Sequence, residues 1–308
     1  MKLEGLHHIT AITADAAVNV DFYARVLGLR LVKKTVNFDA PDVYHLYYGD
    51  EAGTPGSILT FFEFPDAVRG SAGPGMVHKI EWRVADDEAL AFWADRLAKE
   101  GVRTDAAGRL LHFADPEGLE HTLMTTTVAD APLRAHAGGV PAQYALQGLQ
   151  GVRAFARDPA ASAPLLEALG MEAGPKGRWN ASGPRRHGHL HLGGLPDDLA
   201  RPPIQGAGTV HHIAWSAADD EELTAFRARI AEAGARPTPI IDRRYFHSVY
   251  FREPNGVLFE LASRDIGFDV DEPAESLGEA LKLPEQHEPL REKLERTLTP
   301  LPNPRAAA

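Results

Sequence analysis

The chain has 308 residues, a formal net charge of −11 and no cysteine. This acidic balance argues against binding to nucleic acid or to an anionic membrane, because no basic surface is available to neutralise phosphates. Without cysteine, the chain forms no disulfide or zinc–thiolate site, so a metal would have to be bound by His, Asp or Glu. The N-terminal segment lacks the apolar core of a signal peptide and no apolar run is long enough for a membrane span, so we expect a cytoplasmic protein.

Four segments of the chain begin with a similar strand pattern. They read GLHHITAIT from Gly5, MVHKIEWRV from Met76, LQGVRAFAR from Leu149 and TVHHIAWSA from Thr209. A helical pattern follows each strand, and each of these helices has an aspartate that is able to cap it: Asp15, Asp86, Asp158 and Asp219. Each helix pattern stops at a glycine suited to the left-handed position after a helix: Gly28, Gly101, Gly170 and Gly234. We therefore treat the chain as four modules, one to four.

Short strands separated by turn signals follow each of these glycines. The strings DPEG (115–118) and EPNG (253–256) mark the same hairpin turn in modules two and four. The repeating unit is thus βαβββ, and we expect an α+β fold in which the four modules form two cupped, partly closed β-barrels. The expected boundaries are 1–135 for modules one and two, 146–265 for modules three and four, and 266–308 for a C-terminal tail with one short helix.

This arrangement resembles the vicinal oxygen chelate superfamily, the group that contains glyoxalases, bleomycin-resistance proteins and extradiol dioxygenases. The resemblance extends over roughly residues 5–263. It implies two cupped barrels and a metal site for a small molecule within a cup.

Aligning the modules with one another identifies candidate metal ligands. His8 aligns with Lys79, Val152 and His212 on the first strands, and the closing strands align Thr60, Thr122, Leu192 and Glu260. Because neighbours in a strand point to opposite faces, His8 and Thr10 should share a face that excludes His7, and His212 should point away from His211. His8, His212 and Glu260 then form a two-histidine, one-carboxylate set, which suits Fe(II), with Mn(II) compatible with the same ligands.

Each of these residues also has a plainer interpretation. A single histidine in a strand is usually structural, and Glu260 could be an edge-strand charge. A carboxylate in an otherwise apolar strand is, however, costly unless it is paired or bound to a metal.

Module three offers Val152 at the histidine position, so module four has to pair with module one, and the metal site should lie between these two modules. This arrangement resembles the hydroquinone ring-cleaving dioxygenases, and the most specific string is IDRRYFHSVYFREPNGVLFELAS, from Ile241 to Ser263. The resemblance implies that Arg243 and Tyr250 contact an aromatic diol. It also implies the pocket residues that orient the ligands: His7, Thr10 and His211. Tyr250 and Glu260 share a face only if an odd number of residues separates their strands, which a loop at 253–255 would satisfy.

The expected function is an iron-dependent ring-cleaving dioxygenase of aromatic compound catabolism that inserts O₂ into an aromatic diol, a substituted hydroquinone. Exposed sheet edges and the tail are compatible with a homodimer. One alternative is a glyoxalase-type isomerase, which needs a fourth protein ligand where this chain has Thr60, with Glu63 three residues away. A second alternative is a non-catalytic protein that sequesters a small molecule and needs no iron.

A further histidine pair, His189 and His191, lies at alternate positions of one strand in the string GHLH. No carboxylate is near in the sequence, and the equivalent strands carry no such pair. We therefore interpret these two histidines as part of a solvated strand face.

Overall fold

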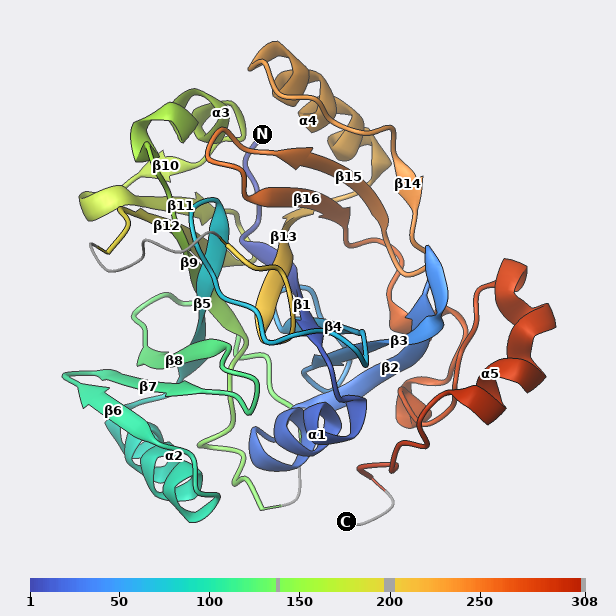
Figure 1. The fold of residues 1–308 in the computed structure, drawn as a ribbon. Coiled ribbons are helices and arrows are strands. Elements are labelled where there is room, and N and C mark those ends of the chain that lie inside the picture. The colour runs from blue at the N-terminus through green and yellow to red at the C-terminus, as the bar shows by residue number, and fades with distance from the viewer. Residues whose placement is uncertain (137–138, 197–202, 306–308) are drawn as a thin grey trace.

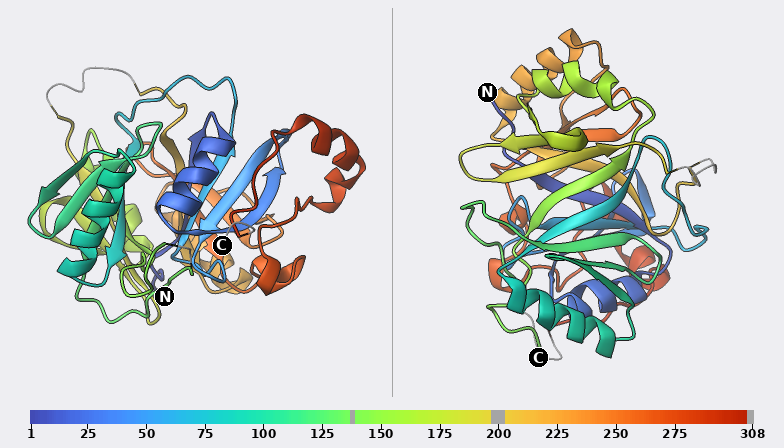
Figure 2. Two further views of the ribbon diagram at one scale, coloured as in Figure 1. Left: turned by 90° about the horizontal axis from the view of Figure 1, so that it is seen from below. Right: turned by 90° about the vertical axis from the view of Figure 1, so that its left-hand side faces the viewer.

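A computed structural model describes residues 1–136, 139–196 and 203–305. Two curled eight-stranded sheets lie side by side and the helices cover their outer faces (Figures 1 and 2). In the described part of the chain, no helix is long and apolar enough to cross a membrane.

The elements follow the βαβββ order of the four modules. Module one contains β1 (Leu6–Thr13), α1 (Ala16–Val20), a π-helical segment (Asp21–Val26), β2 (Arg30–Asn37), β3 (Ala40–Gly49) and β4 (Ile58–Glu63). Module two contains β5 (Met76–Val84), α2 (Asp87–Lys99), β6 (Thr104–Ala107), β7 (Leu110–Ala114) and β8 (Glu120–Thr125). Module three contains β9 (Leu149–Phe155), α3 (Ala163–Ala168), β10 (Glu172–Ala173), β11 (Arg178–Ser182) and β12 (His187–Gly193). Module four contains β13 (Thr209–Ala217), α4 (Asp220–Glu232), β14 (Ile241–Asp242), β15 (His247–Arg252) and β16 (Leu258–Ser263).

The helix boundaries follow from the capping residues. The four aspartates accept hydrogen bonds from backbone N–H groups in the first turn of the helix that follows each of them. The four glycines adopt positive φ angles: 67° at Gly28, 75° at Gly101, 76° at Gly170 and 87° at Gly234. The inner faces of the helices are apolar, as Trp93 and Leu97 on α2 and Phe226 and Ile230 on α4 illustrate. The capping prediction is therefore confirmed in every module.

The sheets join the modules across the chain. The first sheet has the order β14-β15-β16-β13-β1-β4-β3-β2 and combines modules four and one through the antiparallel pair β1 and β13. The second sheet has the order β10-β11-β12-β9-β5-β8-β7-β6 and combines modules three and two through β5 and β9. The α+β class is confirmed. Each sheet is an open, curled cup with two edge strands.

A β-bulge interrupts each of the four central strands. In the first sheet, the extra residues are His7 on β1 and His211 on β13. In the second sheet they are His78 on β5 and Gln150 on β9. A bulge disturbs the strict alternation of side chains between the two faces. The prediction that His211 points away from the cup is therefore wrong, because His211 lines the same cavity as His212.

The bulges also correct the alignment of module three. The first sheet pairs Thr10 with His212, and the second sheet pairs Glu81 with Gly151 at the corresponding place. Gly151, rather than Val152, is thus the counterpart of His212. On the closing strand, the counterpart of Glu260 is His191, one residue before the position that the sequence alignment gave. The alignment slipped because spacing in the sequence does not reveal where the extra residue lies.

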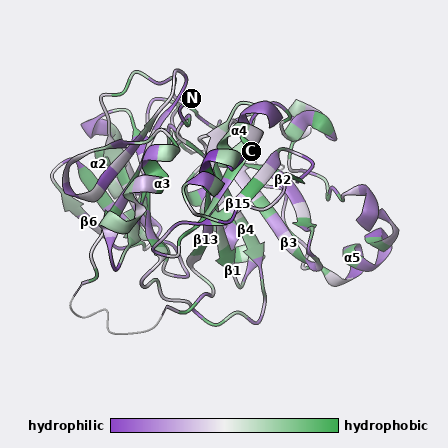
Figure 3. Cartoon of the chain, turned by 90° about the horizontal axis from the view of Figure 1, so that it is seen from above, coloured by the Kyte–Doolittle hydropathy of each residue, from purple (hydrophilic) through white to green (hydrophobic). Residues whose placement is uncertain are grey.

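The C-terminal tail packs against the first sheet and ends beyond α5 (Arg291–Thr297). Its residues Phe268 and Leu277 belong to a small apolar cluster with Tyr47, Tyr245 and Phe246 inside the cup of that sheet. Leu294 of α5 is fully buried, while the rest of this helix is mainly hydrophilic (Figure 3). The tail therefore closes one side of the cup.

Candidate metal centre

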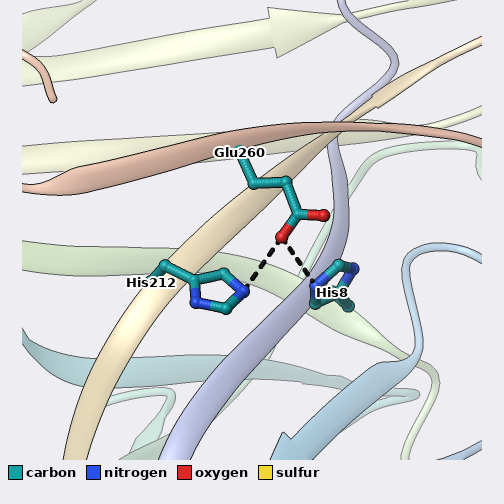
Figure 4. A group of neighbouring side chains, drawn as sticks. All are labelled: His8, His212 and Glu260. Atoms are coloured by element: carbon teal, nitrogen blue, oxygen red, sulfur yellow. Dashed lines mark ion pairs between the residues drawn. The ribbon is translucent and has the colours of Figure 1, made fainter. Parts of the chain in front are cut away.

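Three ionisable side chains meet in the middle of the first sheet. His8, His212 and Glu260 lie on the adjacent strands β1, β13 and β16, where His8 pairs with Ala214 and Ala214 pairs with Glu260. Glu260 Oε2 lies 3.1 Å from His8 Nε2 and 2.9 Å from His212 Nε2 (Figure 4). All three side chains are buried, and their ligand atoms lie within 4.8 Å of one another.

His7 determines which nitrogen of His8 faces this cluster. His7 Nδ1 lies 3.0 Å from His8 Nδ1, and His7 Nε2 lies 3.0 Å from the carbonyl oxygen of Ser263. Burial lowers the pKa of His7 to about 3, so its ring is neutral and carries one N–H. Because a carbonyl only accepts, that N–H is Nε2–H, and His7 Nδ1 accepts the hydrogen bond from His8 Nδ1–H. His8 Nε2 therefore presents a lone pair to the cluster.

His211 and His212 repeat this contact on β13. Their Nδ1 atoms lie 2.8 Å apart, and burial lowers the pKa of His211 to about 4. The neutral ring of His211 therefore supports His212 through the same Nδ1–Nδ1 contact by which His7 supports His8. The bulges thus place a supporting imidazole beside each candidate ligand.

The two oxygens of Glu260 have different environments. Oε1 accepts hydrogen bonds from Ser248 Oγ and from Tyr250 Oη, the latter at 3.1 Å. Oε2 is buried and faces the two imidazoles, and among the described residues it has no other polar neighbour to bond with. Burial by itself would raise the pKa of Glu260, but the neighbouring His8 and His212 lower it well below its usual value. Glu260 is therefore a carboxylate with one free oxygen directed at the two ring nitrogens.

Tyr250 lies beside Glu260, and Arg243 contacts Tyr250. Tyr250 on β15 pairs directly with Glu260 on β16, so the two side chains share a face. The strands are joined by the five residues 253–257 rather than by three, which preserves the required odd number. Arg243 Nε donates to Tyr250 Oη at 3.2 Å, and its guanidinium group also pairs with Asp39. Burial and the nearby Glu260 raise the pKa of Tyr250, so its hydroxyl stays protonated.

A cavity of about 250 Å³ opens beside the cluster. Thr10 and the two candidate histidine ligands line it, together with Arg243 and Tyr250. Its other walls are largely aromatic: Phe38, His45, Tyr47, Phe62, Phe64, His211 and Phe246. His7 lies behind the ligands and does not line the cavity. The eight candidate site residues of the sequence analysis thus lie in one region of the structure: His7, His8, Thr10, His211, His212, Arg243, Tyr250 and Glu260.

The arrangement fits a divalent cation. Two imidazole nitrogens and one carboxylate oxygen, the two Nε2 atoms and Oε2, converge on one buried point, and these are ligand atoms that a divalent first-row metal accepts. Within the described residues, this is the single group of His, Asp and Glu side chains close enough to bind one ion. Glu63 is not part of it, because it accepts a hydrogen bond from the backbone N–H of Ala16 at the start of α1. A three-residue set leaves coordination positions open to small molecules.

Comparisons with known proteins agree with this geometry. The family model described as the glyoxalase/bleomycin resistance protein/dioxygenase superfamily matches residues 5–121 and 148–261. The chain belongs to this superfamily. It is 42% identical to "Putative ring-cleaving dioxygenase MhqO" of Bacillus subtilis over 97% of each chain. It is 33% identical to the chlorohydroquinone/hydroquinone 1,2-dioxygenase of Sphingobium indicum over 96% of each chain. A crystal structure of a "putative dioxygenase" from Bacillus subtilis superposes with a TM-score of 0.90, at 40% identity and 98% coverage of both chains.

The sequence did not identify every residue around the cluster. Ser248 holds Glu260 Oε1, and the alternation along β15 from Tyr250 would have placed it on the same face. His45 and Tyr47 on β3 face the cavity, but the sequence offers no means of ranking them. The two Nδ1–Nδ1 contacts had no signal other than the repeated HH pair, because a bulge is not visible in the spacing of apolar residues.

Proposed function

We propose that this chain is an Fe(II)-dependent ring-cleaving dioxygenase that inserts O₂ into an aromatic diol, in particular a substituted hydroquinone. The observation that carries the proposal is the free Glu260 Oε2, which faces two imidazole nitrogens beside an open cavity. A two-histidine, one-carboxylate set with open positions suits ferrous oxygenases. The names of the relatives support the same class of reaction.

His8, His212 and Glu260 would hold the metal, and His7 and Ser248 would orient two of these ligands. Bound there, Fe(II) would acidify a phenol oxygen and pass electrons between the diol and O₂. Mn(II) would fit the same three ligand atoms.

Tyr250 and Arg243 would act on the ring substrate. Tyr250 holds its proton next to Glu260 and the cavity, in the position for a proton donor to an oxygen of the reacting ring. Arg243 places a permanent positive charge at the same hydroxyl, where it would stabilise negative charge that develops on the ring. His211 would contact the substrate from the lining of the same cavity.

The cavity supports a single-ring substrate. Its volume of about 250 Å³ and its aromatic walls match one flat ring better than a long or highly charged molecule. In a para-diol, one oxygen would reach the cluster and the second would lie toward the far wall.

Oxygen uptake by anaerobically iron-loaded protein tests the proposal. Methylhydroquinone, chlorohydroquinone and catechol would be offered in parallel, with His212→Ala as the control. Uptake with a hydroquinone that is absent in the control is the expected result. An absence of uptake with every diol, in protein that contains one iron per chain, would rule out this function. Tight diol binding without iron would favour a sequestration protein.

A further inference from the structure

Four polar side chains form a hydrogen-bonded row along one wall of the cavity. Tyr47 Oη lies 2.9 Å from His45 Nδ1, His45 Nε2 lies 2.8 Å from Thr60 Oγ1, and Thr60 Oγ1 lies 3.1 Å from Thr10 Oγ1. These residues come from β3, β4 and β1 of module one. We call Tyr47, His45, Thr60 and Thr10 the module-one row.

The strand register leads this row to the candidate metal centre. Tyr47 pairs with Thr60 between β3 and β4, Thr60 pairs with Thr10 between β4 and β1, and Thr10 pairs with His212 between β1 and β13. Thr10 also shares a face with His8, two residues before it on β1. The Thr10 end of the row therefore lies next to both candidate histidine ligands.

The chemistry of the four groups gives the row a direction. A phenol is a good donor and a poor acceptor, so Tyr47 O–H donates to His45 Nδ1. Burial lowers the pKa of His45 well below its usual value, so the ring is neutral and its one hydrogen lies on Nε2. That N–H donates to Thr60 Oγ1, and the Thr60 hydroxyl donates to Thr10 Oγ1.

One proton remains at the end of the row. Thr10 Oγ1 accepts from Thr60, and among the described residues its own hydroxyl hydrogen has no acceptor. Thr10 is almost fully buried, yet it lines the cavity next to the cluster. A buried donor without an acceptor is costly, and a ligand oxygen in the cavity would satisfy it.

We propose that the module-one row directs the Thr10 hydroxyl proton at the diol oxygen that lies against the His8–His212–Glu260 cluster, with His45 as the positioning residue. This inference rests on the proposed function, because it needs an aromatic diol in the cavity. Both nitrogens of His45 are engaged with protein groups, so His45 acts on the diol oxygen through Thr60 and Thr10 and not by a hydrogen bond of its own. The row sets the affinity for the diol by keeping Thr10 a donor instead of an acceptor.

Thr60→Val tests the row at its middle, because valine keeps the shape of threonine and removes the hydroxyl that links His45 to Thr10. The second sheet offers a matched control, Thr122→Val. Thr122 occupies the same register position and bonds to His112 Nδ1 at 2.7 Å, away from the candidate metal centre. The dissociation constant for methylhydroquinone would be measured by anaerobic titration of the iron-loaded protein, with iron content and melting temperature recorded for each variant.

We expect Thr60→Val to raise the dissociation constant about 10-fold, the effect of losing one directed hydrogen bond to a charged oxygen, with unchanged iron content. Thr122→Val should leave the dissociation constant unchanged. His45→Gln, whose amide supplies a donor and an acceptor, should recover part of the affinity that His45→Leu loses. Tyr47→Phe should raise the dissociation constant less than Thr60→Val does. It serves as the second variant if the melting temperature of Thr60→Val is too low for the titration.

Two negative outcomes are distinguishable. If the wild-type iron-loaded protein binds no diol and takes up no oxygen, the proposed function is wrong, and the proposal for the module-one row fails with it. If the wild-type protein is active but Thr60→Val and His45→Leu bind methylhydroquinone as tightly as wild type does, the function stands and the role of the row is wrong.

Discussion

The two sheets have the same strand order and the same bulges, but the polar residues at equivalent positions differ. In the first sheet, two imidazole nitrogens of His8 and His212 and a carboxylate oxygen of Glu260 face one another. At the equivalent positions, the second sheet has Lys79, Gly151 and His191. The backbone geometry is therefore not sufficient to make the candidate metal centre, and the identity of three side chains distinguishes the two cups.

The second sheet neutralises its own carboxylate. Glu81, the counterpart of Thr10, lies 2.5 Å from His189 Nε2 and 3.5 Å from Arg153 Nη1. His189 occupies the space above Gly151, where an added Cβ would lie 2.6 Å from the His189 ring. The interpretation of His189 as a solvated residue is thus wrong: it is buried and paired with a carboxylate that comes from a distant part of the sequence. A satisfied pair of this kind has little affinity left for a metal.

The largest expected difference between the sheets concerns their carboxylates. Glu260→Ala should reduce iron affinity by more than about 100-fold and abolish oxygen uptake. The loss is larger than the roughly 10–100-fold expected when a residue that only hydrogen-bonds to a metal ligand is removed. Glu81→Ala should leave the iron stoichiometry at the wild-type value. Metal analysis after dialysis against a weak chelator measures both. Equal iron loss in the two variants would contradict the assignment of the metal to the first sheet.

Tyr250→Phe should separate catalysis from metal binding. The variant loses the proposed proton donor, so kcat should fall about 100-fold, at the lower end of the range for a positioned acid or base. Iron content should persist, because Ser248 still holds Glu260 Oε1. Steady-state oxygen uptake and metal analysis of the same preparation check the prediction, and a kcat equal to that of wild type would remove Tyr250 from the proposed chemistry.

The bulge histidines offer a subtler comparison. His7→Phe removes the acceptor of His8 Nδ1–H, so iron affinity should fall about 10–100-fold. His78→Phe changes the equivalent bulge residue, which stacks on Phe155 in the second sheet, and should not affect iron binding. Competition with a fluorescent chelator measures both affinities. An iron affinity that is the same in His7→Phe and wild type would show that the contact with His8 does not orient the ligand.

The smallest effect is on stability and its pH dependence. Burial raises the pKa of Glu81, but His189 and Arg153 outweigh burial and the net pKa is lowered. Because the folded pKa lies below the unfolded value, the ion pair stabilises the protein above about pH 4.5, and this stabilisation is lost as the pH falls further. Glu81→Gln should therefore cost about 1–3 kcal/mol at neutral pH and progressively less in acid, with unchanged oxygen uptake. A difference in melting temperature between variant and wild type that does not change with pH would show that the Glu81 ion pair does not stabilise the fold.

Local signals in the sequence were sufficient for much of the fold. The capping aspartates, the glycines after the helices and the periodic apolar residues lie within a few residues of the elements that they define, and all four modules follow them. His8, His212 and Glu260 were also accessible, because the repeat allows equivalent positions to be compared.

Other features depend on contacts between distant residues. The bulges at His7 and His211 arise where two strands from opposite ends of the chain pair with different spacing, so strict alternation misplaced His211. The partners Glu81 and His189 are separated by 108 residues. The row from Tyr47 to Thr10 depends on the register of three strands, which no single segment contains.

A crystal structure of the anaerobically iron-loaded protein, with data collected on both sides of the iron absorption edge, would show whether the first cup binds the metal. We expect one anomalous peak per chain, bound by His8 Nε2, His212 Nε2 and Glu260 Oε2, and no peak in the cup of Glu81 and His189. Iron in the second cup, or at any site that excludes Glu260, would contradict this expectation.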